Sequence, residues 1–402
     1  MRVLQDKYNR GVGIPRVAVS SPRERGIALM VVLGFIFILG MLAWGFAVNM
    51  KVEGVLARKA GAQSEVEWLC RSGVELSKYI LSQQMANAQE PYDSLNQSWA
   101  GGPGSTNGFN VFLDRENLNL TKSAWAPNSI LGQIFPDETE FEEKIGKDTR
   151  CAIQIVDLER KYNINRAAED GVGRFPLEMA FELMGVDVSS IPYLVDAIKD
   201  WRDEDDVERV NGVESKHYEP EGYVSKNGPI DDLKELLLIE GITPKMFWGN
   251  ATNQLAATMM TSTTREEEDE EADYPYGLVD LFTPISVGYI NINTASMEVL
   301  QLLPGMDQNK VSFIMDERVG TDGIDGTWDD TPFTNIRELS TRNIPGFQSR
   351  EAAANAGRFL SVRSATFEVT VTAQMRGMQR TLVAVLSRKD PKDIKILYTY
   401  WK

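Results

Sequence analysis

Histidine and cysteine are scarce in this chain of 402 residues, which contains one histidine, His217, and two cysteines, Cys70 and Cys151. A catalytic triad with histidine, or a zinc site with several histidines, would have to use that single imidazole. Two cysteines allow at most one disulfide and exclude a cysteine-rich metal cluster. Because no nucleophile motif accompanies His217, we expect a surface or supporting histidine, and no enzyme.

Positive charge is also in short supply, since 58 acidic residues face 42 lysines and arginines and the formal net charge is -16. A DNA-binding surface needs clustered lysine and arginine to displace counterions from phosphates. The charge therefore disfavours nucleic acid as a partner, although a local basic patch would remain compatible with it. The length allows two or three domains, each with its own core.

Charge is absent altogether from Ile27 to Met50, a run of 24 residues. A helix of about 20 apolar residues is enough to cross the hydrocarbon core of a membrane. Upstream, residues 1–26 carry six basic residues against two acidic ones. The positive-inside rule places this end in the cytoplasm and everything after Met50 on the other side. The sequence therefore predicts a single-pass membrane protein.

The junction between the basic leader and the apolar run reads "SPRERG" followed by "IALMVVL", with Gly26 before Ile27. It resembles the processing signal of type IV pilins and type II secretion pseudopilins. The resemblance implies that a prepilin peptidase cuts after Gly26 and methylates Ile27, the new N-terminus. An ordinary membrane anchor is the alternative.

A helical stripe continues beyond the apolar run. Apolar residues recur at steps of three and four, which predicts a helix extending some 30 residues past the membrane with one face on a globular head. An ordinary juxtamembrane coiled coil is the alternative. The stripe consists of Val52, Val55, Lys59, Ala62, Val66, Leu69, Gly73, Leu76 and Ile80, in which only Lys59 is polar.

Strand-like patterns occur on both sides of a long helical stretch. Residues 151–165 predict a strand and a turn, and the runs 359–375, 379–388 and 393–401 predict three strands of an antiparallel sheet. Residues 166–355 have a helical pattern between them, which indicates a helical domain inserted into a strand-rich one. The acidic run 265–273 within it reads as a solvated loop.

The sequence "NINTASMEVLQLLPGM" at 291–306, followed at once by "DQNKVSFIMDER", resembles a helix-hairpin-helix, a motif that holds DNA backbones. In a DNA-binding hairpin a small residue follows the turn, so that backbone amides approach phosphate. Met306 and Asp307 occupy that place here, and an aspartate would repel the phosphate. We therefore expect a structural hairpin. The alternative is a membrane-anchored DNA receptor of a competence or pilus-uptake system.

The densest acidic cluster is "DWRDEDDVERVNGVE", in which Asp203, Asp205 and Glu214 fall at positions 1, 3 and 12 of a calcium loop. Position 6 holds Glu208 where an EF-hand requires glycine, so this is no EF-hand. Carboxylates crowded in one loop repel each other unless solvent or a cation intervenes. The residues alone favour a solvated acidic turn. The candidate metal ligands are Asp203, Asp205, Asp206, Glu208 and Glu214.

Two further features stay open. Residues 321–330, "TDGIDGTWDD", form a second Asp/Gly-rich segment that reads as a connecting loop. Cys70 lies in the apolar stripe and Cys151 begins a predicted strand, so the two could meet if the helix packs on the sheet. A disulfide and two buried thiols are both compatible with this pattern.

Several motifs together resemble one family. "YNINRA", "DWRDEDDVERVNGVESKHY", "NGPIDDLKELLLIEGI" and "ININTASMEVLQLLP" occur in this order behind the pilin-type leader and before the closing strands. They resemble general secretion pathway protein K, a minor pseudopilin of type II secretion. The resemblance implies an α+β fold: a long N-terminal transmembrane helix packed on an antiparallel sheet, with a large inserted all-α domain of helix-hairpin-helix or SAM-like type.

The resemblance also divides the chain. It implies a cytoplasmic leader (1–26), the transmembrane part of the first helix (27–50), the first part of a pilin-like α/β domain (51–165), an inserted helical domain (166–355) and the closing strands (356–402).

The function implied by the resemblance is to cap the tip of the pseudopilus, initiate its assembly and take part in export across the outer membrane. It implies I-type and J-type minor pseudopilins, the prepilin peptidase and the inner-membrane secretion platform as partners, with no nucleic acid. It places the chain in the inner membrane with its C-terminal domain in the periplasm. It also implies calcium in the helical domain.

Overall fold

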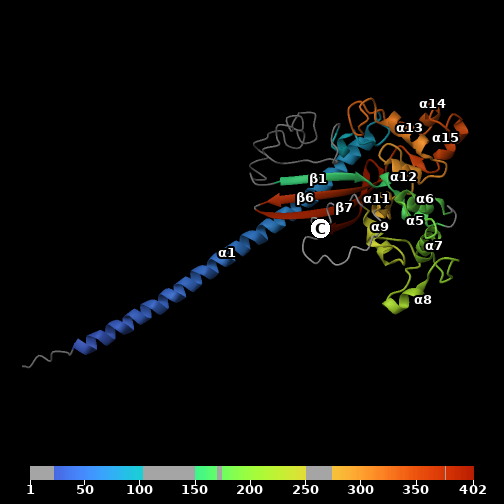
Figure 1. The fold of residues 1–402 in the computed structure, drawn as a ribbon. Helices are drawn as coiled ribbons and strands as arrows, with labels where there is room; N and C mark the ends of the chain where they lie inside the picture. The colour runs from blue at the N-terminus through green and yellow to red at the C-terminus, as the bar shows by residue number, and fades with distance from the viewer. Residues whose placement is uncertain (1–21, 103–149, 170–173, 250–273, 376) are drawn as a thin grey trace, which may run out of the picture. The chain divides into compact units, whose positions relative to one another are not determined.

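The computed structural model describes residues 22–102, 150–169, 174–249, 274–375 and 377–402 (Figure 1). The chain divides into two units, Met1–Gln63 and Ser64–Lys402, and each is described separately. The acidic run 265–273 and the leader up to residue 21 lie outside the described residues.

The first unit contains the N-terminal part of helix α1 (Pro22–Ala86). Its apolar side chains from Leu29 to Met50 are exposed, and the helix is long and apolar enough to cross a membrane. This agrees with the transmembrane segment predicted at 27–50. Gly26 and Ile27 lie inside the helix, close to its beginning.

The second unit contains a four-stranded antiparallel sheet with the strand order β1-β6-β7-β8. β1 (Arg150–Asp157) is separated in sequence from β6 (Thr366–Met375), β7 (Met378–Asp390) and β8 (Asp393–Trp401). β6 ends at Met375 and β7 begins at Met378, and Gly377, directly before β7, has φ +77°. Glycine adopts this left-handed backbone without the steric cost of a Cβ atom. The predicted sheet is confirmed.

The part of α1 that belongs to the second unit packs on one face of this sheet. Val66, Cys70, Val74 and Leu81 are buried with the strand residues Ile153, Val369 and Val371. Burying an aliphatic side chain stabilises a fold by roughly 1.5–3 kcal/mol. The predicted stripe is therefore rotated slightly, because Leu69 and Leu76 are only partly buried while Cys70, Val74 and Ser77 are fully buried.

Helices fill the stretch between β1 and β6. They are α5 (Ile164–Ala167), α6 (Phe175–Met184), α7 (Ile191–Arg202), α8 (Ser215–Tyr218), α9 (Pro244–Trp248), α11 (Leu278–Leu281), α12 (Met297–Gln301), α13 (Gln308–Arg318), α14 (Glu338–Thr341) and α15 (Arg350–Ala356). The 3-10 turns are η2 (Leu158–Arg160), η4 (Glu219–Glu221) and η5 (Leu233–Leu238). A separate 3-10 turn, η1 (Ser98–Ala100), follows α1. These helices share one hydrophobic core, distinct from the core between α1 and the sheet.

Two short parallel strand pairs lie in the same stretch. β2 (Tyr162–Asn163) pairs with β3 (Phe282–Thr283), and β4 (Ile290–Asn291) pairs with β5 (Leu360–Ser361). They join the beginning and the end of the inserted stretch to its middle.

The predicted hairpin is present as α12 and α13, whose turn contains Gly305 at φ +80°. Asp307 is the N-cap of α13, and its carboxylate accepts a hydrogen bond from the backbone N–H of Lys310 at 3.0 Å. That carboxylate covers an amide that a phosphate would need, which supports a structural hairpin. A second turn of the same kind, with Gly346 at φ +83°, joins α14 and α15 and was not identified from the sequence.

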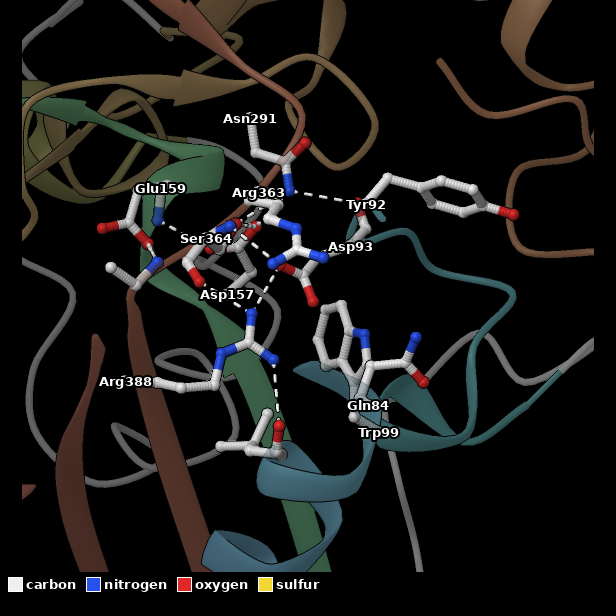
Figure 2. A network of polar contacts seen from close by, with 12 residues as sticks. Gln84, Tyr92, Asp93, Trp99, Asp157, Glu159, Asn291, Arg363, Ser364 and Arg388 are labelled. Carbon is white, nitrogen blue, oxygen red and sulfur yellow. Dashed lines mark hydrogen bonds and ion pairs between the residues drawn. The ribbon is translucent and has the colours of Figure 1, made fainter. Parts of the chain in front are cut away.

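A buried network of polar side chains connects the loop after α1 to the end of β1 and to β7 (Figure 2). Arg388 donates to the Asp93 carboxylate at 2.5 Å and to the backbone oxygen of Leu81 at 3.2 Å. The Asp157 carboxylate accepts from the hydroxyls of Ser364 and Thr294, both at 2.6 Å. The network therefore links the sheet to the inserted helices, since Thr294 precedes α12.

Asn291 and Glu159 extend this network. The Asn291 amide donates to Asp157 at 3.2 Å and to Ser364 at 2.7 Å. Glu159 accepts from the backbone N–H groups of Val287, Ala365 and Thr366 at 2.9–3.2 Å. Burial raises the pKa of the Asp157 and Glu159 carboxyls. The neighbouring Asp93 carboxylate also raises the pKa of Asp157, and the Asp157 carboxylate also raises the pKa of Glu159.

Candidate metal centre

The candidate metal centre lies where α7 ends and the acidic loop begins. α7 is amphipathic, and its inward face includes Leu194, Ile198 and Trp201. It ends at Arg202, and the following C-cap residue, Asp203, has an extended backbone at φ -71° and ψ 174°. The chain then returns through residues 204–214 to α8, which brings Glu214 back to the last turn of α7.

Three carboxylates meet at this point. Asp200, Asp203 and Glu214 each offer an oxygen, and these oxygens lie within 4.8 Å of one another. The side chains of Asp200 and Glu214 are buried, and that of Asp203 is mostly buried. Such a concentration of negative charge away from water is costly unless a cation compensates for it.

Several oxygens at this site lack a hydrogen-bond partner among the described residues. They are both carboxylate oxygens of Glu214, Oδ1 of Asp203 and the hydroxyl of Ser225, which lies beside Glu214. Most buried polar atoms in proteins are satisfied, so a group of unsatisfied oxygens indicates a missing partner. Oxygen-only donors suit a hard cation, and Ca²⁺ takes six to eight of them. The residues present therefore fit calcium.

Arg209 supplies part of the compensating charge. Its guanidinium donates to Asp200 Oδ1 at 2.6 Å and also to Asp203, and its backbone N–H donates to Asp200 Oδ2 at 3.1 Å. These bonds occupy Asp200 and one oxygen of Asp203. They leave Glu214 and Asp203 Oδ1 free for a cation.

The electrostatics of the site reflect this crowding. Burial, together with the neighbouring carboxylates of Asp200, Asp203 and Asp206, raises the pKa of Glu214 to about 7. Ser225 lies close enough to counteract this partly. Burial also raises the pKa of Asp200, against the lowering effect of Arg209.

Gly212 permits the loop to approach α7 so closely. A Cβ atom at this position would lie 1.8 Å from Oδ2 of Asp200. Any other residue would therefore push the loop or the carboxylate away. This glycine positions the backbone that carries Glu214 to the site.

The structure brings together two of the five predicted ligands, Asp203 and Glu214. Asp205, Asp206 and Glu208 are exposed and lie outside this cluster of three carboxylates. Asp206 accepts from Ser215 at 2.9 Å and from Asn227 at 3.0 Å. Sequence reasoning missed Asp200. The available signal was its spacing, because residues three apart lie on the same face of a helix.

The second Asp/Gly segment, 321–330, is held by its own carboxylates. Asp329 accepts from the backbone and hydroxyl of Thr321 at 2.7 Å, and Asp330 accepts from the backbone of Gly326 at 2.7 Å. Asp325 pairs with Arg318, whose side chain is buried. These bonds agree with the connecting loop expected from the sequence.

Neither His217 nor the cysteines form a reactive site in the described part of the chain. The His217 imidazole is partly exposed and lies 3.6 Å from the Glu240 carboxylate. Cys70 and Cys151 are free thiols, and both are buried. Cys70 is within 3.6–3.8 Å of the backbone oxygens of Val371 and Arg380.

Comparison with known proteins connects this region to a family. Residues 160–248, which include all three clustered carboxylates, match the family described as "Type II secretion system (T2SS), protein K". The match covers about a fifth of the chain. No curated protein matches the sequence.

The fold is similar over a longer stretch to a solved structure. It is a chain of the crystal structure entitled "GspK-GspI-GspJ complex from enterotoxigenic Escherichia coli Type 2 Secretion System". The identity is 15%, the TM-score is 0.56, and the match covers 86% of this chain and 99% of that chain. The likeness supports the helix-and-sheet fold of this chain. The DNA-receptor alternative receives no support from either comparison.

Proposed function

We propose that this chain is a K-type minor pseudopilin that caps the tip of a type II secretion pseudopilus, initiates its assembly and takes part in protein export across the outer membrane. The observation that carries the proposal is the family match of residues 160–248. A minor pseudopilin of this kind acts as a structural component of the secretion system, with no catalytic step of its own.

The partners proposed are the I-type and J-type minor pseudopilins. The similar solved structure is a complex of GspK, GspI and GspJ. The long helix α1 supports this assignment, since it offers an extended apolar surface for neighbouring helices. We further propose the inner-membrane secretion platform as a partner, with the leader in the cytoplasm and the C-terminal domain in the periplasm.

Two features favour the terminal place in the filament. In most pilins the fifth mature residue is a glutamate that pairs with the N-terminus of a neighbouring subunit. Counting from Ile27 that residue is Val31, and the first acid after it is Glu53. A carboxylate in hydrocarbon needs a positively charged partner. This chain lacks the carboxylate itself, so it cannot pair with the N-terminus of a neighbouring subunit in this way. The inserted helices would also collide with the next subunit along a tightly wound filament.

Co-expression tests the partner proposal. The full chain is expressed with I-type and J-type minor pseudopilins, extracted in detergent and weighed by native mass spectrometry. One copy of each protein in a single complex is expected. A complex that lacks the I and J proteins, or gold-labelled antibody repeated along the filament shaft, contradicts the proposed tip location.

Processing is tested separately by mass spectrometry of the mature N-terminus. Cleavage after Gly26 predicts an N-methylated Ile27, and Gly26→Val is expected to leave the leader attached. Retention of Met1 in the natural sequence contradicts pilin-type processing.

We also propose that the carboxylates of Asp200, Asp203 and Glu214 bind calcium. Support comes from their mutual proximity and from the unsatisfied oxygens around them. The cation would hold the acidic loop against α7 and stabilise the inserted helices.

A further inference from the structure

The outer strand of the sheet has a free edge. β8 is last in the order β1-β6-β7-β8, so within the described residues it pairs on one side only. A register shift interrupts its pairing near Leu386, but the four residues from Tyr398 to Trp401 pair regularly with β7. Proteins usually block such an edge with charge, proline or a covering segment, because it offers unpaired backbone groups. Here Tyr398, Tyr400 and Trp401 are about 40% exposed.

On the sheet face opposite α1, a cleft of about 770 Å³ runs beside this edge. Tyr398 and Tyr400 line it from β8, and their rings are stacked with centroids 6.2 Å apart. Asp231 and Asp232 line the cleft from the inserted helical stretch, and Glu368 lines it from β6.

Glu368 is the unusual member of this cleft. Its carboxylate is half-buried, and it has no hydrogen-bond or ion-pair partner within the described part of the chain. Burial raises the pKa of this carboxyl, and the nearby Lys161 and Lys402 lower it without forming an ion pair with it in the described structure. The Lys161 ammonium instead donates to the backbone oxygen of Val279 at 2.7 Å. A partly desolvated anion favours a cation beside it, and the faces of two tyrosines favour the same kind of ligand.

On the α1 side of the sheet, a groove of about 550 Å³ adjoins the same edge. It is lined by Ile396 and Trp401 of β8, by Leu382 of β7 and by Trp68 of α1. Trp68 is 67% exposed, which is high for the largest apolar side chain. This second hollow is mainly apolar.

We propose that the free edge of β8 binds an extended segment of a partner protein as an added strand. Successive side chains of a strand point to opposite faces of a sheet. Such a segment can therefore place a basic side chain in the tyrosine cleft, beside Glu368, and an apolar side chain in the groove beside Trp68. The Glu368 carboxylate favours a positively charged side chain in the segment, and hydrogen bonds to the backbone edge of β8 supply the affinity.

The test uses the full chain in detergent micelles and synthetic seven-residue peptides. The first peptide alternates valine with threonine and has one arginine at its centre, on the threonine face. Its matched control replaces the arginine with citrulline, which has the same shape without the charge. Isothermal titration is expected to show binding of the arginine peptide and about tenfold weaker binding of the citrulline peptide.

Two further comparisons separate the charge from the backbone. Glu368→Gln is expected to remove the difference between the two peptides, whereas Glu351→Gln, at an exposed glutamate, leaves it unchanged. Methylating the peptide amides on one edge is expected to abolish binding, and methylating those on the other edge is not.

Equal affinity for the arginine and citrulline peptides overturns the cation site, and binding that survives methylation of either edge overturns strand addition. A dimer in sedimentation that excludes the peptide would assign the edge to a second copy of the chain and also overturn the proposal. None of these results affects the secretion role, which the co-expression experiment tests independently.

Discussion

Arg388 on β7 and Asp93 in the loop after α1 form an ion pair that is almost wholly buried, with side-chain exposures of 1% and 2%. The two residues are 295 positions apart in sequence. The same guanidinium reaches the backbone oxygens of Leu81 and Ser364, so one side chain holds α1, its following loop and the sheet together.

Replacing Arg388 with methionine is therefore expected to destabilise the protein strongly. It removes the positive charge that pairs with Asp93 in Figure 2 and leaves this buried carboxylate without its ion-pair partner. Breaking such a pair costs about 3–5 kcal/mol of unfolding free energy. Urea denaturation of a fragment of residues 51–402 measures it. Lys395→Met, which breaks an exposed pair with Asp393, is the control and should change stability by less than about 1 kcal/mol.

The Asp157 and Glu159 carboxyls predict a pH dependence. Their pKa values are higher in the folded protein than in the unfolded chain, chiefly because of burial. A carboxyl of this kind stabilises the fold fully below its unfolded pKa, and the contribution is lost as pH rises through the folded pKa. The two groups should thus favour the folded state more at pH 5 than at pH 9.

Glu159→Gln isolates this effect. An amide N–H facing the backbone donors of Val287 and Thr366 lowers stability at every pH, so the informative quantity is the change with pH. The stability advantage of the natural protein over the variant should shrink between pH 5 and pH 9. An advantage that stays constant or grows would show that the carboxylate is charged in the fold throughout. Glu351→Gln, at an exposed site, controls for general pH effects.

The sequence identified the elements whose patterns are local. The apolar run 27–50 predicted a helix, the runs 359–375, 379–388 and 393–401 predicted the strands that close the chain, and the helical pattern of 166–355 predicted the helices between β1 and β6. The hairpin glycine Gly305 was also recognisable, because a Pro-Gly pair ends one helix directly before another begins.

Long-range contacts could not be predicted in the same way. Sequence spacing suggested an acidic loop that binds a cation through neighbouring residues, whereas the structure selects Asp203 and Glu214 and adds Asp200 from the preceding helix. The path of the chain after α7 determines which carboxylates meet, and this path requires Gly212 to lie directly against Asp200. Likewise, no local pattern marks Asp93 as the partner of Arg388.

The two cysteines lead to a chemical prediction. Both thiols are buried and free, and burial raises the pKa of Cys151 to about 12. The reactive thiolate form is therefore rare near neutral pH. A thiol reagent added to the native fragment, without reductant, should label neither cysteine quickly, and it should label two per chain after unfolding in urea. Labelling of none after unfolding would instead indicate a disulfide between Cys70 and Cys151.

Calcium is expected to raise the melting temperature of the fragment of residues 51–402. A ligand at 100 times its dissociation constant stabilises the folded state by about 2.7 kcal/mol, which corresponds to a shift of roughly 5 °C for a domain of this size. Asp203→Asn and Glu214→Gln should each abolish the shift, because both contribute buried oxygens that lack other partners.

Asp205→Asn and Glu208→Gln are the matched controls for this site. They remove the same charge from the same loop, but their side chains are exposed and lie outside the cluster of three carboxylates. Both control variants should keep the calcium-induced rise in melting temperature. If calcium acted only by screening the negative charge of the loop, all four variants would reduce this rise equally. Magnesium provides a second control, since it requires near-ideal octahedral geometry and holds its water more tightly. A melting temperature that responds to neither calcium nor chelator would contradict the site.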